Sequence, residues 1–177
     1  EKEHELNCVG VRTDVKCILI GAIKKIHEMK GVTTFAVLGN TEQYNIDVKG
    51  VENFLQNAGY YGPFSIEFLH KNGKNYFMEV NFRNDGLAYV PTAAGWNLHS
   101  FYMTDDLRYI DPSKWKVVYA MNTSLEPLRV KDGGISWWQW LIELSKTRTF
   151  INMNFNDLKP LCFYYLTKLK NKLHFVG

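Results

Sequence analysis

Two glutamates, an asparagine and an arginine are the residues of this chain best suited to bind a metal ion and phosphate. Glu67 lies in a first stretch of alternating apolar and polar residues. Glu79, Asn81 and Arg83 follow at intervals of two residues in a second such stretch. Alternate residues of a β-strand point to the same face of a sheet. Carboxylate and amide oxygens are hard donors that suit Mg²⁺, and a planar guanidinium matches phosphate oxygens. The spacing therefore predicts a Mg²⁺ site at Glu67, Glu79 and Asn81, with Arg83 near bound phosphate.

These side chains need two strands, joined by a turn, to bring them together. In both segments apolar residues alternate with the polar ones, so that one face of the hairpin is apolar and the other is polar. The apolar positions are Phe64, Ile66 and Phe68 in the first strand and Tyr76, Met78 and Val80 in the second. On composition alone, a solvated hairpin face explains the polar residues equally well, because antiparallel sheets often expose one face to water.

The length of the turn decides whether the polar groups share a face. A two-residue turn at Asn72-Gly73 would pair Glu67 with Met78 and direct Glu79 toward the core, where an unpaired charge is costly. A three-residue loop, Lys71-Asn72-Gly73, instead pairs Glu67 with Phe77 and keeps the polar groups on one face. We therefore predict the three-residue loop, although Asn-Gly usually indicates the shorter turn.

The sequence E-V-N-F-R at 79–83, preceded by an acid one strand upstream, resembles the ATP-grasp superfamily. Within that superfamily it is most similar to the carbamoyl-phosphate-synthase-like carboxylate–amine ligases. The resemblance implies that Glu79 and Asn81 hold the Mg²⁺ ions that bridge the ATP phosphates and that Glu67 is a further metal ligand. It also implies that Arg83 binds phosphate and stabilises its charge during catalysis. Phe82 departs from the family pattern, since many members have Pro there.

The resemblance extends to the segments on either side of the hairpin. Residues 91–98, P-T-A-A-G-W-N-L, are similar to the family helix that follows the metal site. Residues 2–5 are similar to the point where these ligases enter the larger ATP-grasp subdomain, and Glu3 matches a family glutamate that approaches the nucleotide. No glycine-rich phosphate flap precedes this point. We therefore expect the carboxy-terminal part of a ligase, inactive without its amino-terminal part.

The remaining pattern predicts an α+β fold, with a mainly antiparallel sheet covered by helices. Apolar residues at helical spacing predict a helix over 47–58, whose apolar face should pack on the hairpin. Strands are expected over 4–11, 15–26, 31–37 and 116–121, and further helices over 97–107, 135–145 and 158–173. Residues 1–107 are assigned to the larger ATP-grasp subdomain and 108–177 to a helical extension packed on it.

Three tryptophans fall in the helix expected over 135–145. Large aromatic side chains usually cover a core, so we expect Trp137, Trp138 and Trp140 to do so. A ligand-binding platform is the alternative. His70, His99 and His174 form no metal-ligand spacing, and we expect them to be surface or hydrogen-bonded residues.

Composition narrows the class of protein. The 177 residues are 46% hydrophobic and 22% charged, as in an ordinary globular domain, and the net charge of +3 does not indicate a nucleic-acid partner. Three cysteines without metal spacing favour a reducing compartment, so a cytoplasmic location is expected. The sequence contains no apolar run long enough to span a membrane.

Together these observations predict part of a ligase that uses ATP and Mg²⁺, with Mn²⁺ as the alternative metal. Its partners would be ATP, a small carboxylate, an amine or ammonia, and the missing amino-terminal part of the same enzyme. The expected reaction proceeds through an acyl-phosphate intermediate. The sequence leaves open whether the protein forms a homo-oligomer. A non-catalytic nucleotide-binding or interaction module is the alternative, and a metal-dependent hydrolase is a third interpretation, weakened by the lack of a separate His or Asp base.

Overall fold

The computed structural model describes residues 3–151, 153 and 157–174, and it has an α+β architecture. Eight strands form one sheet in the order β6-β5-β1-β3-β4-β7-β8, with β2 paired to β1. The strands are β1 (His4–Arg12), β2 (Cys17–Leu19), β3 (Ala22–Met29), β4 (Val32–Gly39), β5 (Gly62–Lys71), β6 (Lys74–Asn81), β7 (Val118–Met121) and β8 (Thr147–Phe150). The α-helices are α1 (Val48–Asn57), α2 (Val90–Ala93), α3 (Leu98–Thr104), α4 (Glu126–Lys131), α5 (Trp137–Lys146) and α6 (Lys159–His174).

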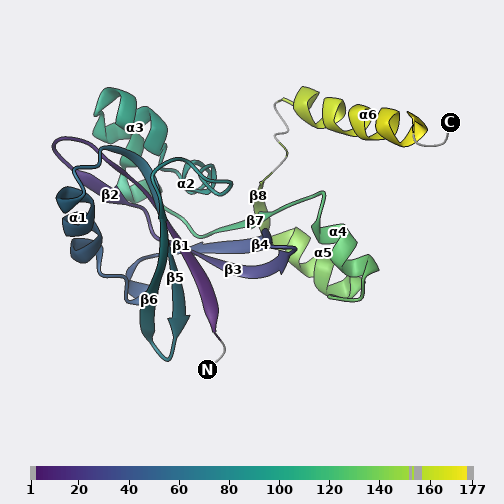
Figure 1. Ribbon diagram of the computed structural model, residues 1–177, viewed down its shortest axis with the longest axis horizontal. Coiled ribbons are helices and arrows are strands. Elements are labelled where there is room, and N and C mark those ends of the chain that lie inside the picture. The colour runs from purple at the N-terminus through teal and green to yellow at the C-terminus, as the bar shows by residue number, and fades with distance from the viewer. Residues whose placement is uncertain (1–2, 152, 154–156, 175–177) are drawn as a thin grey trace.

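The strand pairs are antiparallel except for the parallel pair β7–β8, which α4 and α5 connect. This confirms the expected mainly antiparallel sheet with packed helices. Figure 1 shows α1 beside the β5–β6 hairpin, α2 and α3 above the sheet, and α4 with α5 beyond the ends of β3 and β4. Three short 3-10 helices complete the described part of the chain, at Glu42–Tyr44, Leu107–Ile110 and Pro112–Lys114.

Apolar core clusters lie on both faces of the sheet. On one face, Val9, Val11 and Ala36 pack against Leu98 and Phe101 of the α3 region. On the other face, α1 contributes Val51 and Leu55, which pack on Phe64, Ile66, Phe68 and Val80 of the hairpin. The predicted packing of the 47–58 helix on the apolar hairpin face is therefore confirmed. Asp47 caps α1 by accepting a hydrogen bond from the Gly50 amide at 2.8 Å.

The predicted three-residue hairpin loop is wrong. Lys71 pairs with Lys74, which leaves a two-residue turn, and Asn72 and Gly73 have φ values of 51° and 71°. Positive φ at both central residues is the geometry that Asn-Gly favours in a hairpin. Pairing would then have placed Glu67 opposite Met78 in a regular ladder.

A β-bulge restores the polar face that the turn would have broken. Phe68 pairs with Phe77, but the next pair is Glu67 with Glu79, so that Met78 is the extra residue. One added residue exchanges the two faces of a strand. Glu67 and Glu79 are therefore directly opposite each other on one face, as predicted, but for a different reason. Met78, which was expected on the apolar face, is the bulge residue and is 47% exposed.

The strand expected over 15–26 is divided into β2 and β3. Both halves pair with β1, β2 at the Arg12 end and β3 at Leu6 and Asn7. The segment therefore bends at Ile20-Gly21 to follow one neighbour. The helix expected over 97–107 ends earlier, because α3 stops at Thr104 and Asp105 adopts a left-handed conformation with φ of 55°.

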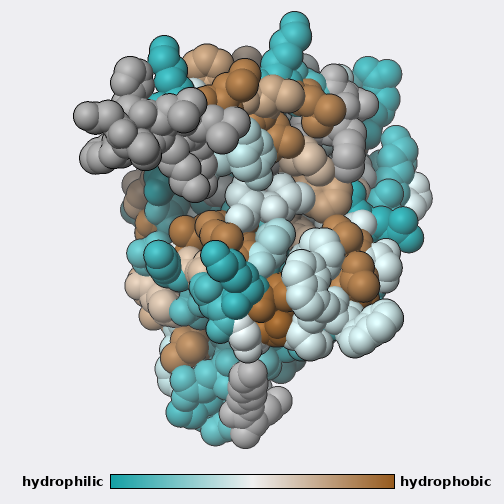
Figure 2. Space-filling model, turned by 90° about the vertical axis from the view of Figure 1, so that its right-hand side faces the viewer, coloured by the Kyte–Doolittle hydropathy of each residue, from teal (hydrophilic) through white to brown (hydrophobic). Residues whose placement is uncertain are grey.

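The tryptophan helix forms, but the expected role of the indoles is wrong for two of the three. Trp137 and Trp138 are 62% and 76% exposed, whereas Trp140 is partly buried, and Glu143 is the one buried residue of α5. The face of the molecule on the right of Figure 1 exposes hydrophobic side chains in separate patches among hydrophilic ones (Figure 2). The helical pattern of 135–145 therefore places aromatic residues on the outer side, and the core is covered by other elements.

Residues 108–177 supply two strands as well as helices, because β7 pairs with β4 and β8 with β7. The division at residue 107 stays a prediction, and residues 1 and 2 of the first predicted domain lie outside the described part of the chain. Among the described residues, no helix combines the length and apolar character that crossing a membrane requires.

Candidate functional site

The predicted metal ligands lie on the two neighbouring strands β5 and β6, beside a residue of β1. Glu67 of β5 pairs with Glu79 of β6 on one side and with Asn7 of β1 on the other. Asn81 is two residues beyond Glu79, and its Nδ2 donates a hydrogen bond to Glu79 Oε1 at 3.0 Å. The structure therefore brings Glu67, Glu79 and Asn81 to one face of the sheet, next to a buried asparagine.

A lysine on β3 holds the carboxylate of Glu67. The Nζ atom of Lys25 lies 2.8 Å from Glu67 Oε2 and 2.8 Å from Glu5 Oε2. Burial lowers the pKa of Lys25, but the hydrogen bonds that it donates to Glu5 and Glu67, with the attraction of these two charges, outweigh burial and raise the pKa above its ordinary value. The ammonium group is therefore charged at neutral pH and fixes the position of Glu67.

Asn7 links Glu67 to a further acid, Asp85. Its Nδ2 lies 3.5 Å from Glu67 Oε1 and 2.5 Å from Asp85 Oδ2. The other oxygen of Asp85 accepts a hydrogen bond from the Leu87 amide at 2.8 Å. The Oδ1 atom of Asn7 is buried and accepts no hydrogen bond from the residues that the structure describes. A buried oxygen without a hydrogen bond, beside two carboxylates, is suited to contact a cation or a hydrogen-bond donor.

A surface cavity of about 210 Å³ opens at this cluster. Asn7, Lys25, Glu67 and Asp85 line it, together with the β3–β4 turn at residues 31–33. Glu79 is exposed at the sheet edge, and Asn81 is half-buried. The cluster thus combines a fixed inner part at Asn7 and Glu67 with an accessible outer part at Glu79.

The other two predicted residues lie at the edges of this arrangement. Arg83 is exposed, and its Nη1 donates to the backbone oxygen of Asn84 at 3.0 Å. Glu3 lies at the hairpin end, where it forms an ion pair with Lys71, and hydrogen bonding to Lys71 lowers the pKa of its carboxyl group. Glu3 therefore contacts Lys71, and Arg83 contacts Asn84, instead of the Glu67 cluster.

The sequence prediction missed Asn7, Lys25 and Asp85. Asp85 continues the spacing of two that runs through Glu79, Asn81 and Arg83, so the pattern itself contained a signal. Asn7 and Lys25 lie on strands that are distant in sequence, and only the pairing of β1 with β5 and β3 brings them to Glu67. As a set, these groups offer hard oxygen donors and one ammonium, which suits a site for a divalent cation and phosphate.

No protein-family model matches the chain, and no curated protein matches it. Many solved structures are similar to it, and two of them are biotin carboxylase structures. The first is a biotin carboxylase from Campylobacter jejuni in complex with β,γ-ATP, with a TM-score of 0.50 and 15% identity over 58% of this chain and 25% of that chain. The second is the biotin carboxylase domain dimer of the Hydrogenobacter thermophilus 2-oxoglutarate carboxylase, in complex with MgADP, ADP and bicarbonate. Its TM-score is 0.52, with 16% identity over 66% of this chain and 28% of that chain.

Biotin carboxylase is an ATP-grasp enzyme, so the similarity identifies the fold. The chain spans about a quarter of the length of these two structures. At this level of identity the comparison concerns the arrangement of the backbone and not the reaction. The chain has an α+β fold that is similar to part of these ATP-grasp structures.

Proposed function

We propose that this chain is part of an ATP-dependent carboxylate–amine ligase of the carbamoyl-phosphate-synthase-like group. The observation that supports this most directly is the pairing of Glu67 with Glu79 on one sheet face, with Asn81 hydrogen-bonded to Glu79. It occurs in a fold shared with solved structures that contain an ATP ligand, or MgADP and ADP. The assignment of residues 1–107 to the larger subdomain, and of 108–177 to an extension, is part of the same proposal.

The donor set fits Mg²⁺. Glu67, Glu79 and Asn81 would hold the ion, and the vacant Oδ1 of Asn7 adds a fourth oxygen beside them. Bound Mg²⁺ supplies charge neutralisation for the ATP phosphates. Mn²⁺, which also prefers oxygen ligands, is the alternative ion.

The residues of this chain would orient the reactants. Lys25 and Asn7 hold Glu67 in one orientation, so that its carboxylate is pre-positioned. Arg83 would turn from Asn84 to phosphate oxygens and stabilise their charge, and Glu3 would approach the nucleotide. A carboxylate oxygen of the substrate then attacks the γ-phosphorus of ATP, and ADP leaves. The amine nitrogen next attacks the acyl carbon, inorganic phosphate leaves, and the amine loses a proton.

The whole enzyme is part of the proposal. The amino-terminal part of the ATP-grasp domain would supply the rest of the nucleotide clamp, and the 177-residue chain alone would not turn over ATP. The three cysteines are free thiols in the structure, which is consistent with the proposed cytoplasmic location.

A non-catalytic nucleotide-binding or interaction module is the second candidate, and Lys25 is the observation that favours it. Its ammonium group already contacts Glu67 at 2.8 Å, in the position where a cation would be held. If Lys25 replaces the metal charge permanently, then the domain keeps the fold and the phosphate site but not the metal-dependent chemistry.

The experiment compares the parent chain with Glu79→Gln. Mg²⁺–ATP binding is measured by calorimetry on the chain, and ADP release is measured on the complete gene product with candidate carboxylates and amines. We expect Glu79→Gln to melt normally, because Glu79 is exposed, and to lose binding at least tenfold. A normally melting variant that binds Mg²⁺–ATP as the parent does would contradict the metal assignment. Binding that depends on Glu79 without any substrate-dependent ADP release would favour the module.

A further inference from the structure

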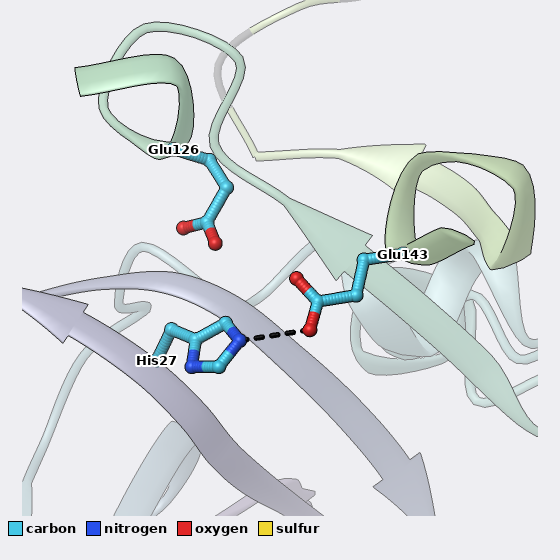
Figure 3. A group of neighbouring side chains, drawn as sticks. All are labelled: His27, Glu126 and Glu143. Atoms are coloured by element: carbon cyan, nitrogen blue, oxygen red, sulfur yellow. Dashed lines mark hydrogen bonds and ion pairs between the residues drawn. The ribbon is translucent and has the colours of Figure 1, made fainter. Parts of the chain in front are cut away.

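A second cluster of ligand groups lies at the junction of the sheet with α4 and α5, and it does not belong to the site above. His27 comes from β3, Glu126 from the first turn of α4, and Glu143 from α5. One ligand atom from each lies within 4.8 Å of the others. Figure 3 shows both carboxylates directed into the same space as the imidazole, with the His27–Glu143 hydrogen bond at one side.

The burial of the two carboxylates is the unusual feature. Glu126 is fully buried, and Glu143, at 8% exposure, is the most buried residue of its helix. Neither oxygen of Glu126 accepts a hydrogen bond from the described residues, and Oε2 of Glu143 accepts none either. Buried carboxylates are costly unless they are paired, hydrogen-bonded or bound to a metal ion. These three oxygens are therefore available to a ligand inside the cluster.

Neighbouring groups hold the carboxylates from outside. Nη1 of Arg129 lies 3.5 Å from Glu126 Oε1, and Nε2 of Gln139 donates to Glu143 Oε1 at 3.0 Å. Metal-binding carboxylates are commonly supported in this way by a second layer of polar groups. Among the described residues at this cluster, Arg129 supplies one positive charge against two carboxylates, so that a neutral imidazole leaves Glu143 with hydrogen bonds but without a countercharge.

A β-bulge directs His27 toward the helices. Lys25 pairs with Ala36 and His27 with Phe35, so that Ile26 is an extra residue on β3. Because Ala36 and Phe35 are consecutive, Lys25 and His27 point to opposite faces of the sheet. The His27 ring also stacks on Phe35 with centroids 5.8 Å apart. The imidazole is thus fixed on the far side of the sheet from Glu67.

From these contacts we infer that His27, Glu126 and Glu143 form a binding site for a divalent transition-metal ion, for which Zn²⁺ is the best fit. Zn²⁺ accepts imidazole nitrogen and carboxylate oxygen together, whereas Mg²⁺ prefers oxygen ligands alone. Three protein ligands leave a fourth position for water. The ion removes the uncompensated negative charge and uses the oxygens that have no hydrogen bond.

The required movement is small. Ligand atoms around a tetrahedral Zn²⁺ ion are about 3.3 Å apart, since each lies roughly 2.0–2.1 Å from the metal. Nε2 of His27 and Oε1 of Glu143 are already 2.9 Å apart. One ligand atom from each of the three residues already lies within 4.8 Å of the others, so rotation of the Glu126 and Glu143 side chains would bring their oxygens without hydrogen bonds to the ion. His27 also lines a surface cavity of about 640 Å³, so the histidine side of the cluster is next to solvent-filled space.

The bound ion would join three elements that are distant in sequence. It would tie α4 and α5 to β3 and so fix the carboxy-terminal part of the sheet. The fourth position would remain open to water or to a small anion. This proposal does not depend on the ligase assignment, because none of its three ligands belongs to the Glu67 cluster.

The test uses the metal-free 177-residue chain, prepared with a chelator and titrated with Co²⁺ and then with Zn²⁺. We expect one equivalent of Co²⁺ to bind with a visible absorption band, and Zn²⁺ to displace it. His27→Gln and Glu143→Gln should each weaken binding more than tenfold, since even the loss of an outer supporting group weakens metal affinity by about 10–100-fold. Zn²⁺ should raise the melting temperature of the parent but not of these variants.

Two matched controls separate this site from other metal binding. His99→Gln removes an exposed histidine on α3, and Glu79→Gln removes a carboxylate from the proposed Mg²⁺ site. Both variants should keep the parental Zn²⁺ affinity. If Glu79→Gln lost Mg²⁺–ATP binding but kept Zn²⁺ binding, the two proposals would be supported independently, and each can fail without the other.

Two results would overturn the inference. One is a parent chain that binds no stoichiometric Co²⁺ or Zn²⁺, in which case protonated His27 and Arg129 balance the two carboxylates as an ion-pair network. The other is a folded His27→Gln variant with parental affinity. If the ligand variants His27→Gln and Glu143→Gln both failed to fold, X-ray absorption spectroscopy of the Zn²⁺-loaded parent would decide. One imidazole with oxygen ligands would support the site, and a sulfur ligand or several imidazoles would exclude it.

Discussion

Nζ of Lys25 lies 2.8 Å from Oε2 of Glu67, and this contact connects β3 to β5 across the intervening strand β1. The same ammonium contacts Glu5 at 2.8 Å. The pair is largely shielded, since the Lys25 and Glu67 side chains are 11% and 16% exposed. Lys25 therefore stabilises the arrangement of acids on this face and also competes with any cation for Glu67.

Lys25→Met should destabilise the fold while making Glu67 more available to metal. We expect the free energy of unfolding to fall by about 1–3 kcal/mol, because two partly buried carboxylates lose their charged donor. Mg²⁺ should stabilise Lys25→Met more than it stabilises the parent. Urea denaturation with and without Mg²⁺ measures both effects. Lys71→Met is the control: it removes an exposed, solvent-screened ion pair with Glu3 and should change stability far less than Lys25→Met does.

The contribution of Lys25 should depend on pH in one direction. Its pKa is raised in the folded chain, so its stabilising effect is complete below the unfolded value of about 10.4 and is lost as pH rises through the folded value. The difference in unfolding free energy between parent and Lys25→Met should therefore be constant from neutral pH to about pH 9 and shrink above about pH 10.4. A difference that grows with pH in this range would contradict the assignment.

Deletion of Met78 tests the role of the bulge. Removing the extra residue leaves Phe77 opposite Phe68 and Glu79 opposite Glu67, so the polar face should survive and stability should change by about 1 kcal/mol or less. Deletion of Val80 is the matched control, because it would turn Asn81 toward the apolar face and should cost more than about 2 kcal/mol. Thermal melting and amide NMR spectra compare the two. If both deletions lowered the melting temperature equally, the direction in which the side chains point would not be what the bulge determines.

The cysteines should differ in reactivity. Burial raises the pKa of Cys8 to about 12, and burial with the nearby Glu52 charge raises that of Cys17 to about 11. Cys162 is exposed. Near pH 8, iodoacetamide should therefore label Cys162 first, Cys17 slowly and Cys8 only after unfolding, as mass spectrometry of the peptides would show. Rapid labelling of Cys8 in the folded chain would contradict its buried position.

The same burial gives an alkaline limit to stability. Because the pKa of the Cys8 thiol is raised in the folded state, its contribution to stability is complete below the unfolded pKa of about 8.5. That contribution is lost as the pH rises toward the folded pKa of about 12. Cys8→Ala should therefore melt with a weaker dependence on pH above about pH 8.5 than the parent does.

The tryptophans of α5 should matter little for stability. Trp138 is 76% exposed, so Trp138→Ala should change the unfolding free energy by no more than about 0.5 kcal/mol. Trp115 packs against the core around Phe101, and its Nε1 donates to the Ile20 backbone oxygen at 3.1 Å. Trp115→Ala should cost at least about 2 kcal/mol. Chemical denaturation measures both, and a large cost at Trp138 would indicate that α5 is covered in solution.

The local patterns of the sequence predicted the elements well where one principle decided the outcome. Period-two alternation predicted the hairpin strands, and helical spacing predicted α1 and its packing on the hairpin. The turn prediction failed because two requirements competed. Asn-Gly favours the short turn, and the apolar face requires an odd insertion; the chain satisfies both by placing the extra residue at Met78 instead of in the loop.

The sites were less accessible to sequence reasoning. Glu67, Glu79 and Asn81 share one hairpin, so their proximity follows from local pairing. Lys25 reaches Glu67 only through the strand order β5-β1-β3, which alternation cannot provide. His27 meets Glu143 across 116 residues, after a bulge that reverses the direction of its side chain. Spacing alone therefore gives no sign of this cluster.

The bulge at Met78 also bears on how the molecule avoids its own copies. Strand β6 is an edge of the sheet, and Tyr76, Phe77 and Met78 are exposed along it. A flat apolar edge is a template on which a strand from another chain can pair. The extra residue interrupts the regular row of backbone donors and acceptors and twists the strand, and Lys71 and Lys74 add charge at the end of the hairpin. The irregularity that aligns Glu79 with Glu67 thus also hinders edge-to-edge aggregation.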